Sequence, residues 1–298
     1  MQMLSQKILE AVSKVVLGKQ TEIKLSLTCL LAGGHLLIED LPGMGKTTLA
    51  QTLAQVLGLH FRRTQFTSDL LPADIIGVSV YDRNVSAFTF HRGPVFTNVF
   101  LADEVNRASP KTQSALLEAM EEQQITVDGH THPLPNPFFV IATQNPKHHI
   151  GTFPLPESQL DRFLMRIELG YPDSASERAL LKNEGGRNAG TTHAICDAQA
   201  VLAMQQAAQT VYVSESVLDY LQALIGFTRN QYSTGLSPRA GLGLRKSAQA
   251  WAMLEGRDFV TPEDIQAVFG SIADHRIQHD QQSNIGQAIL QQVNIPSH

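Results

Sequence analysis

The sequence predicts an α/β domain built on a parallel sheet, followed by a smaller all-helical domain. Short apolar runs of strand length alternate with stretches of helical periodicity through about residue 170. These runs stop abruptly at polar residues, which is typical of parallel strands whose carboxyl ends bind ligands. Beyond Gly170 the chain is rich in Ala, Leu and Gln at helical spacing. We therefore expect the α/β domain over residues 1–170 and the helical domain over residues 171–298.

The elements expected in the first domain follow one another in strand–helix order. The run 35–39 is short and apolar, as suits a strand buried on both faces of a parallel sheet. The other elements are helices over 22–31 and 46–57 and strands within 60–66, 98–104 and 137–145. Residues 78–81 and 88–90 can pair as a hairpin around a turn at 82–84.

Composition narrows the class of protein. Hydrophobic residues make up 43% of the 298 residues and charged residues 17%, as in an ordinary globular chain. The formal net charge of −5 argues against a nucleic-acid-binding protein, which usually carries a basic excess. Cys29 and Cys196 form no C-x-x-C motif and are expected to be free thiols. The amino-terminal residues lack the features of a signal peptide, so we expect a cytoplasmic location.

The stretch HLLIEDLPGMGKTTLA, residues 35–50, resembles a phosphate-binding loop between a strand and a helix. Backbone N–H groups over residues 43–48 can point into such a loop, and the helix dipole adds positive potential. Lys46 is expected to reach the β- and γ-phosphates, and the Thr47 hydroxyl is expected to bind Mg²⁺. The predicted nucleotide-binding residues are Gly18, Pro42, Gly43, Met44, Gly45, Lys46, Thr47 and Thr48.

The loop departs from the usual G-x-x-x-x-G-K-[ST] pattern because Asp40 stands where the first glycine is expected. That position precedes the phosphate cradle, and aspartate tolerates turn conformations. Gly43 and Gly45 still leave the close approach free of Cβ atoms. We therefore expect Asp40 to face away from the phosphates and the loop to function.

Two further apolar runs end in polar residues that suit ATP hydrolysis. In VFLADE, Asp103 is expected to hold Mg²⁺ and Glu104 to polarise the attacking water. In FFVIATQNP, Asn145 is expected to orient that water. Because a nucleotide-dependent binding switch does not need Glu104, its presence favours hydrolysis over a switch without significant turnover.

Arginines follow near the predicted domain junction. Charge that develops on the γ-phosphate calls for a guanidinium, and Arg162 or Arg166 could supply it to the site of a neighbouring subunit. Arg239 begins a predicted helix after Ser237 and Pro238, and we expect it to reach the nucleotide of its own subunit.

With these residues in place, the sequence resembles the AAA+ ATPases of the P-loop NTPase class, and within them the MoxR family. The resemblance covers nearly the whole chain, and the Asp40 form of the loop also occurs in that family. The segments that carry it are VVLGKQ, LAGGHLLIEDLPGMGKTTLA, QFTSDLLPADIIGVSVYD, GPVFTNVFLADEVNRASPKTQSALLEAMEE, ATQNP, LPESQLDRF, SPRAGLGL and LEGRDFVTPEDI.

The resemblance implies specific roles and partners. Asn145 matches the sensor-1 position, Arg162 the arginine finger, Arg239 the sensor-2 arginine, and Gly18 the stretch that lines the adenine pocket. Inserted hairpins are implied near residues 70–96 and 124–137, with a C-terminal helical lid. The resemblance also implies ATP and Mg²⁺ as cofactors and a ring, usually a hexamer. It further implies a partner with a von Willebrand A domain and a protein client, with membrane contact only through a partner.

A DNA-acting motor is the main competing interpretation, since relatives with similar hairpins act on DNA. Such a motor needs basic residues where its hairpins meet phosphate. Residues 123–139 contain no Lys or Arg, and the chain is acidic overall. We therefore expect no nucleic-acid partner.

Overall fold

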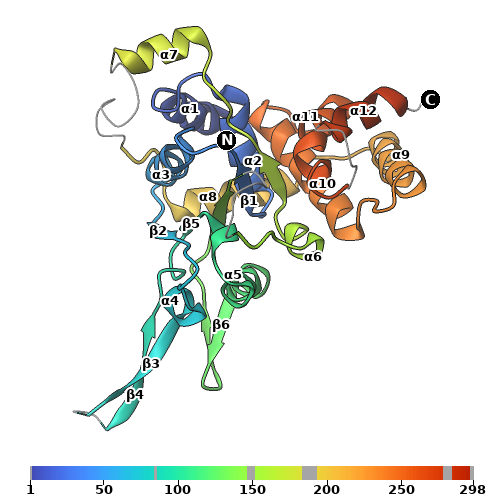
Figure 1. Cartoon of the computed structure of the whole chain (residues 1–298). Coiled ribbons are helices and arrows are strands. Elements are labelled where there is room, and N and C mark those ends of the chain that lie inside the picture. Colours follow the sequence, from blue (N-terminus) through green and yellow to red (C-terminus); the bar gives the residue numbers. More distant parts are fainter. Residues whose placement is uncertain (1, 84–85, 146–151, 183–192, 278–283, 296–298) are drawn as a thin grey trace.

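The structure is a computed structural model that describes residues 2–83, 86–145, 152–182, 193–277 and 284–295. Its centre is a five-stranded sheet in which all the paired strands run parallel (Figure 1). In spatial order the strands are β2 (Phe61–Gln65), β5 (Val99–Asp103), β8 (Phe139–Gln144), β1 (Leu36–Glu39) and β9 (Met165–Ile167). The predicted α/β fold is confirmed, and the strand bounds differ from the expected ones by one or two residues.

Alternate residues of the strands enter two separate hydrophobic clusters, because side chains of a strand point to opposite faces. Leu36, Val99 and Phe139 belong to the larger cluster, whereas Leu37 and Phe100 belong to the smaller one. The helices that contribute to the larger cluster include α1 (Gln2–Ser13), α2 (Gln20–Leu31), α3 (Lys46–Val56), α8 (Ala198–Gln209) and α10 (Pro238–Leu254). On the other face lie α4 (Pro72–Ile76) and α5 (Pro110–Glu122). Helices therefore cover both faces of the sheet.

Two hairpins extend away from the sheet in the same direction (Figure 1). The first pairs β3 (Gly77–Asp82) with β4 (Ala87–Arg92), which confirms the predicted pairing; Asn84 of its expected turn lies outside the described residues. The second pairs β6 (Gln124–Val127) with β7 (His130–Pro133). The rings of Phe90 and His132 stack at 4.4 Å between ring centroids and join the two hairpins.

After β9 the described elements are helices. They are α7 (Ser174–Leu181), α8, α9 (Glu215–Gln231), α10, α11 (Pro262–Ala273) and α12 (Ile285–Gln292), and the short helix α6 (Glu157–Leu160) precedes β9. The start of α10 agrees with the expected signal, because the Ser237 hydroxyl caps it by accepting from the Ala240 N–H. None of the described helices is long and apolar enough to cross a membrane.

The buried side chain of Arg276 connects the helical region to the segment that leads into β9. Arg276, just after α11, donates to the Asp161 carboxylate at 2.7 Å and to the carbonyls of Phe163 and Leu164. Its side chain is only 5% exposed. The segment that enters β9 is thereby fixed to the end of α11.

Replacing this guanidinium should destabilise the fold. Arg276→Met keeps the volume but leaves a carboxylate and several carbonyls without their donor, so we expect a loss of about 3 kcal/mol in unfolding free energy. Urea unfolding followed by circular dichroism measures this. The control Arg178→Met, at an exposed site on α7, should change stability by less than about 0.5 kcal/mol. Equal unfolding midpoints for the two variants would contradict the role given to Arg276.

Candidate functional site

The phosphate loop connects β1 to α3 at the carboxyl edge of the sheet. Gly43 and Gly45 have φ values of +87° and +90°, in the left-handed region that side chains other than glycine rarely adopt. A Cβ at either position would meet no atom within 4 Å, so the backbone angle is what requires glycine here. The turn brings the unpaired amides at the start of α3 to the loop, and α3 begins at Lys46.

The loop lines one cavity of about 320 Å³ together with residues from the ends of β2, β5 and β8. This arrangement brings together the three motifs that are separate in the sequence. The lining residues are Pro42, Gly43, Gly45, Lys46, Thr47, Thr48, Arg63, Gln65, Asp103, Glu104 and Asn145. Met44 is not among them, and its side chain packs against the larger hydrophobic cluster, so its contact with the nucleotide stays a prediction.

The Lys46 ammonium lies among carbonyl oxygens of its own loop. It donates to the carbonyls of Asp40 and Leu41, the second at 2.9 Å. Burial lowers the pKa of Lys46, while the negative charges of Asp40, Asp103 and Glu104 oppose that shift. An anionic phosphate in the cavity would offer this cation stronger acceptors than neutral carbonyls.

One hydroxyl orients the acidic pair at the end of β5. The Thr143 hydroxyl on β8 donates to the Asp103 carboxylate at 2.5 Å and accepts from the Glu104 N–H at 2.9 Å. Glu104 has φ +56°, an unusual backbone conformation for a residue other than glycine, which costs on the order of 1 kcal/mol. Its carboxylate accepts from Asn145 at 3.4 Å and from Arg107 at 2.8 Å. The predicted base and the predicted water-orienting residue are therefore in contact.

The residues present fit a magnesium ion that arrives with a nucleotide. Thr47 and Asp103 line the same cavity as Lys46, which is the donor set predicted for such an ion. The described residues contain no group of three or more His, Cys, Asp or Glu side chains that could hold a metal ion. Mg²⁺ bound with a nucleotide needs no such group, because phosphate oxygens and water complete its coordination.

Sequence reasoning missed three residues of this cavity region: Arg63, Gln65 and Thr143. Arg63 on β2 donates to Asp103 through two nitrogens, at 2.7 and 3.1 Å, and to Gln65 at 3.1 Å. The register of β2 on β5 places Gln65 opposite Asp103. Arg63 and Gln65 could have been predicted from their position near the carboxyl end of a strand. The carboxyl ends of all strands in a parallel sheet lie at the same edge, where ligands bind.

Asp40 faces away from the phosphate loop, and it cross-links that loop to the chain after β9. One carboxylate oxygen accepts the N–H groups of Leu169 and Gly170, at 2.8 and 2.6 Å, and the other accepts the N–H of Leu41. The aspartate at the position of the first glycine therefore joins the loop to the predicted domain junction.

Gly18 lies apart from the lining of the phosphate cavity. Its φ is +68°, and a Cβ there would come within 2.5 Å of the Ser176 hydroxyl oxygen at the start of α7. Next to it, Lys19 donates to the carbonyl of Tyr171 at 2.7 Å. Gly18 thus allows the start of α7 to pack closely against the turn between α1 and α2. Its contact with adenine stays a prediction.

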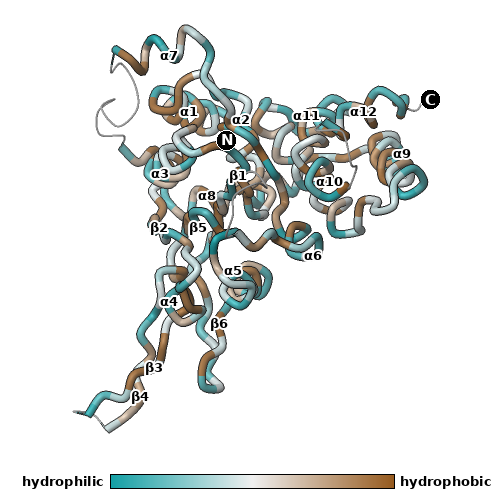
Figure 2. The backbone as a smooth tube through the Cα atoms, viewed as in Figure 1, coloured by the Kyte–Doolittle hydropathy of each residue, from teal (hydrophilic) through white to brown (hydrophobic). Residues whose placement is uncertain are grey.

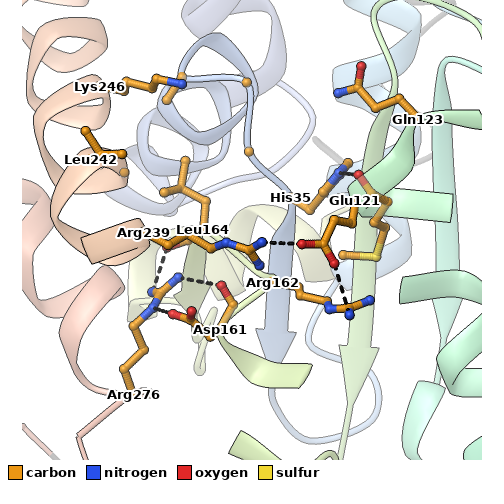
Figure 3. A pocket seen from close by; sticks show the side chains of 15 residues that line it. His35, Glu121, Gln123, Asp161, Arg162, Leu164, Arg239, Leu242, Lys246 and Arg276 are labelled. Atoms are coloured by element: carbon orange, nitrogen blue, oxygen red, sulfur yellow. Dashed lines mark hydrogen bonds and ion pairs between the residues drawn. The ribbon is translucent and has the colours of Figure 1, made fainter. Parts of the chain in front are cut away.

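The predicted arginines line other cavities. Arg162 and Arg239 both lie in a cavity of about 580 Å³ between α5, α10 and the segment before β9 (Figure 3). The expectation that Arg239 reaches the nucleotide of its own subunit is wrong for this structure, because Arg239 pairs with Glu121 on α5. Arg166 pairs with Glu39 at 3.0 Å and lines a third cavity, so it does not join Arg162.

The role of Asp40 can be tested by restoring the usual glycine. Asp40→Gly leaves the N–H groups of Leu169 and Gly170 without their acceptor, so we expect a loss of about 2 kcal/mol in unfolding free energy. Asp40→Asn keeps an acceptor oxygen and should lose less. Thermal and urea unfolding measure both variants, and a stability gain in Asp40→Gly would contradict this account.

Comparisons with known proteins agree with the geometry. Residues 35–165 match the family model described as ATPase family associated with various cellular activities (AAA), and residues 228–293 match an AAA lid domain. The chain is 39% identical to Chaperone MoxR1 of Mycobacterium tuberculosis, over 89% of this chain and 73% of that protein. It is 32% identical to Protein MoxR of Paracoccus denitrificans, over 90% of this chain and 86% of that one.

A solved structure shows the same fold. The crystal structure of a Cytophaga hutchinsonii protein assigned as an ATPase superposes with a TM-score of 0.90 at 39% identity, covering 99% of this chain and 96% of that one. With a phosphate loop, an acidic pair and a helical lid in one chain, and with these relatives, the protein belongs to the MoxR family of AAA+ ATPases.

Proposed function

We propose that this chain hydrolyses Mg²⁺-bound ATP in a ring of identical subunits and uses the energy to remodel or activate a partner protein complex. The observation that carries the proposal is the division of the catalytic residues between two cavities. Lys46, Thr47 and Glu104 line one cavity, whereas Arg162 and Arg239 line another. Two copies placed head to tail, with the phosphate cavity of one against the arginine cavity of the next, would supply a complete set.

Each residue of the phosphate cavity has a task in this reaction. Lys46 would exchange its carbonyl acceptors for phosphate oxygens. Glu104 would take the proton of the attacking water, which Asn145 holds in place. Mg²⁺, held by Thr47 and Asp103, would supply Lewis-acid stabilisation of the phosphate charge. Asp103 would then release Arg63, its partner in this structure.

The hairpins support a protein client over a nucleic acid. Val78, Val80, Tyr81 and Phe88 of the β3–β4 hairpin are exposed, and Phe88 is 72% exposed. Figure 2 shows hydrophobic colour along this hairpin, which extends away from the sheet. The β6–β7 hairpin carries no Lys or Arg, and the strands of the β3–β4 hairpin carry one, Arg92. Exposed apolar side chains suit contact with a polypeptide, whereas DNA needs cations.

The number of subunits and the kind of partner are proposed from the membership in the MoxR family. We propose six subunits in the ring and a partner with a von Willebrand A domain, through which membrane contact would occur. We place the activity in the cytoplasm, which the two free cysteines, Cys29 and Cys196, favour.

Two substitutions separate nucleotide binding from turnover. Glu104→Gln should lower kcat by about a hundredfold or more while ATP stays bound and the ring becomes more stable. Lys46→Ala should weaken ATP binding by about tenfold or more. Turnover assays, titration with a fluorescent ATP analogue and sedimentation velocity measure these effects. Unchanged turnover in Glu104→Gln would show that another group is the base.

The DNA-motor alternative makes a different prediction. We expect the ATPase rate of the wild-type protein to be the same with and without single-stranded DNA at every salt concentration tested. The measurement is a salt series of steady-state rates. A stimulation by DNA that fades as salt rises would favour the motor instead.

A further inference from the structure

The cavity that holds Arg162 and Arg239 has an uneven distribution of charge. Four cationic side chains line it, Arg162, Arg239, Lys246 and Arg276, against two carboxylates, Glu121 and Asp161. Its lining therefore carries two positive charges in excess, which suits an anionic ligand.

The carboxylate of Glu121 contacts both Arg162 and Arg239 in this cavity. Glu121 Oε2 lies 3.0 Å from the terminal nitrogen of Arg162, and Oε1 accepts from a terminal nitrogen of Arg239. In Figure 3 the two guanidinium groups approach Glu121 from different sides. Each guanidinium uses one nitrogen for this contact, so most of its five N–H donors remain available. Both stay accessible, with Arg162 30% and Arg239 52% exposed.

The second carboxylate is not available to these arginines. Asp161 accepts from Arg276 at 2.7 Å and from the Ser237 hydroxyl at 3.2 Å. Because Arg162 follows Asp161 and Arg239 follows Ser237 closely, these bonds hold the backbones of the two arginines near each other. Their side chains would repel one another, and Glu121 is the anion that lies between them.

The position of Glu121 in its helix argues against a purely local stabilising role. Glu121 lies in the last turn of α5, which ends at Glu122. The negative end of the helix dipole disfavours a carboxylate there. Hydrogen bonding to Arg239, first, and the charges of both arginines hold the pKa of Glu121 below its usual value, so the carboxylate stays ionised.

We propose that Glu121 is a positioning residue that holds Arg162 and Arg239 as a paired receptor for the terminal phosphate of ATP bound to a second copy of this chain. This inference rests on the proposed function, because the phosphate loop of the same copy lines a different cavity. A terminal phosphate presents several oxygens at once, and two guanidiniums can each bind it through paired N–H groups. The carboxylate keeps both side chains in place before the phosphate arrives, which reduces the rotamer freedom lost on binding.

The first test compares neighbouring glutamates of α5. Glu121→Gln should lower kcat at full assembly by about tenfold or more. Binding of a fluorescent ATP analogue to the dilute subunit should stay within about twofold of wild type, because the phosphate loop is untouched. Glu121→Asp keeps the charge but is too short to reach both guanidiniums, so kcat should fall as well. The matched control Glu122→Gln, at the exposed neighbouring position, should keep wild-type turnover. Wild-type kcat in both Glu121 variants would overturn the proposal.

A mixing experiment shows which copy Glu121 acts on. Glu121→Gln subunits retain an intact phosphate loop, and Lys46→Ala subunits retain intact arginines. Mixed in equal amounts, they should regain turnover above that of either variant alone, since each intact loop can face an intact arginine pair. Arg162→Ala mixed with Lys46→Ala is the reference.

The two mixtures distinguish the role of Glu121 from the active site shared between two copies, on which that role depends. Recovery in the Arg162→Ala mixture but not in the Glu121→Gln mixture would overturn the role of Glu121 and leave the shared site standing. Failure of both would overturn the shared site itself. Recovery in both supports the proposal.

Discussion

The cationic groups proposed to bind a triphosphate lie in two separate cavities of this chain. Lys46 and the amides at the start of α3 lie at the carboxyl edge of the sheet, whereas Arg162 and Arg239 lie in a different cavity beside α5 and α10. The charge that develops on a γ-phosphate during hydrolysis needs cations from more than one direction. This separation ties the proposed activity to assembly.

Short polar links hold each half in shape. Asp40 joins the phosphate loop to the backbone after β9, and Thr143 fixes the relative orientation of Asp103 and Glu104. On the other side, Arg276 anchors the segment that carries Arg162 to the end of α11. Because β9 lies between these anchors, a displacement of the helical region would move both the loop support and the arginine.

Much of the fold and of the phosphate cavity could be predicted from the sequence. Strand ends, glycines and the lysine belong to local patterns whose geometry follows from backbone sterics, so the segments around Gly45, Asp103 and Asn145 were placed correctly. The contacts of Arg63 and Thr143 with Asp103 could not be predicted, because they depend on how neighbouring strands pair and not on the sequence of one strand. Arg239 was assigned to the wrong cavity since the orientation of a helical domain on a sheet depends on tertiary packing. The role of Glu121 could not be predicted, because its partners Arg162 and Arg239 lie far from it in the sequence.

Turnover per subunit, measured at saturating ATP and Mg²⁺ across a wide range of protein concentration, tests the central claim most directly. If two copies complete each site, the rate is very low for dilute single subunits and rises to a plateau over the concentrations at which sedimentation detects assembly. A rate per subunit that is the same from the dilute single chain to the assembled form would contradict it, because one chain would then complete its own site.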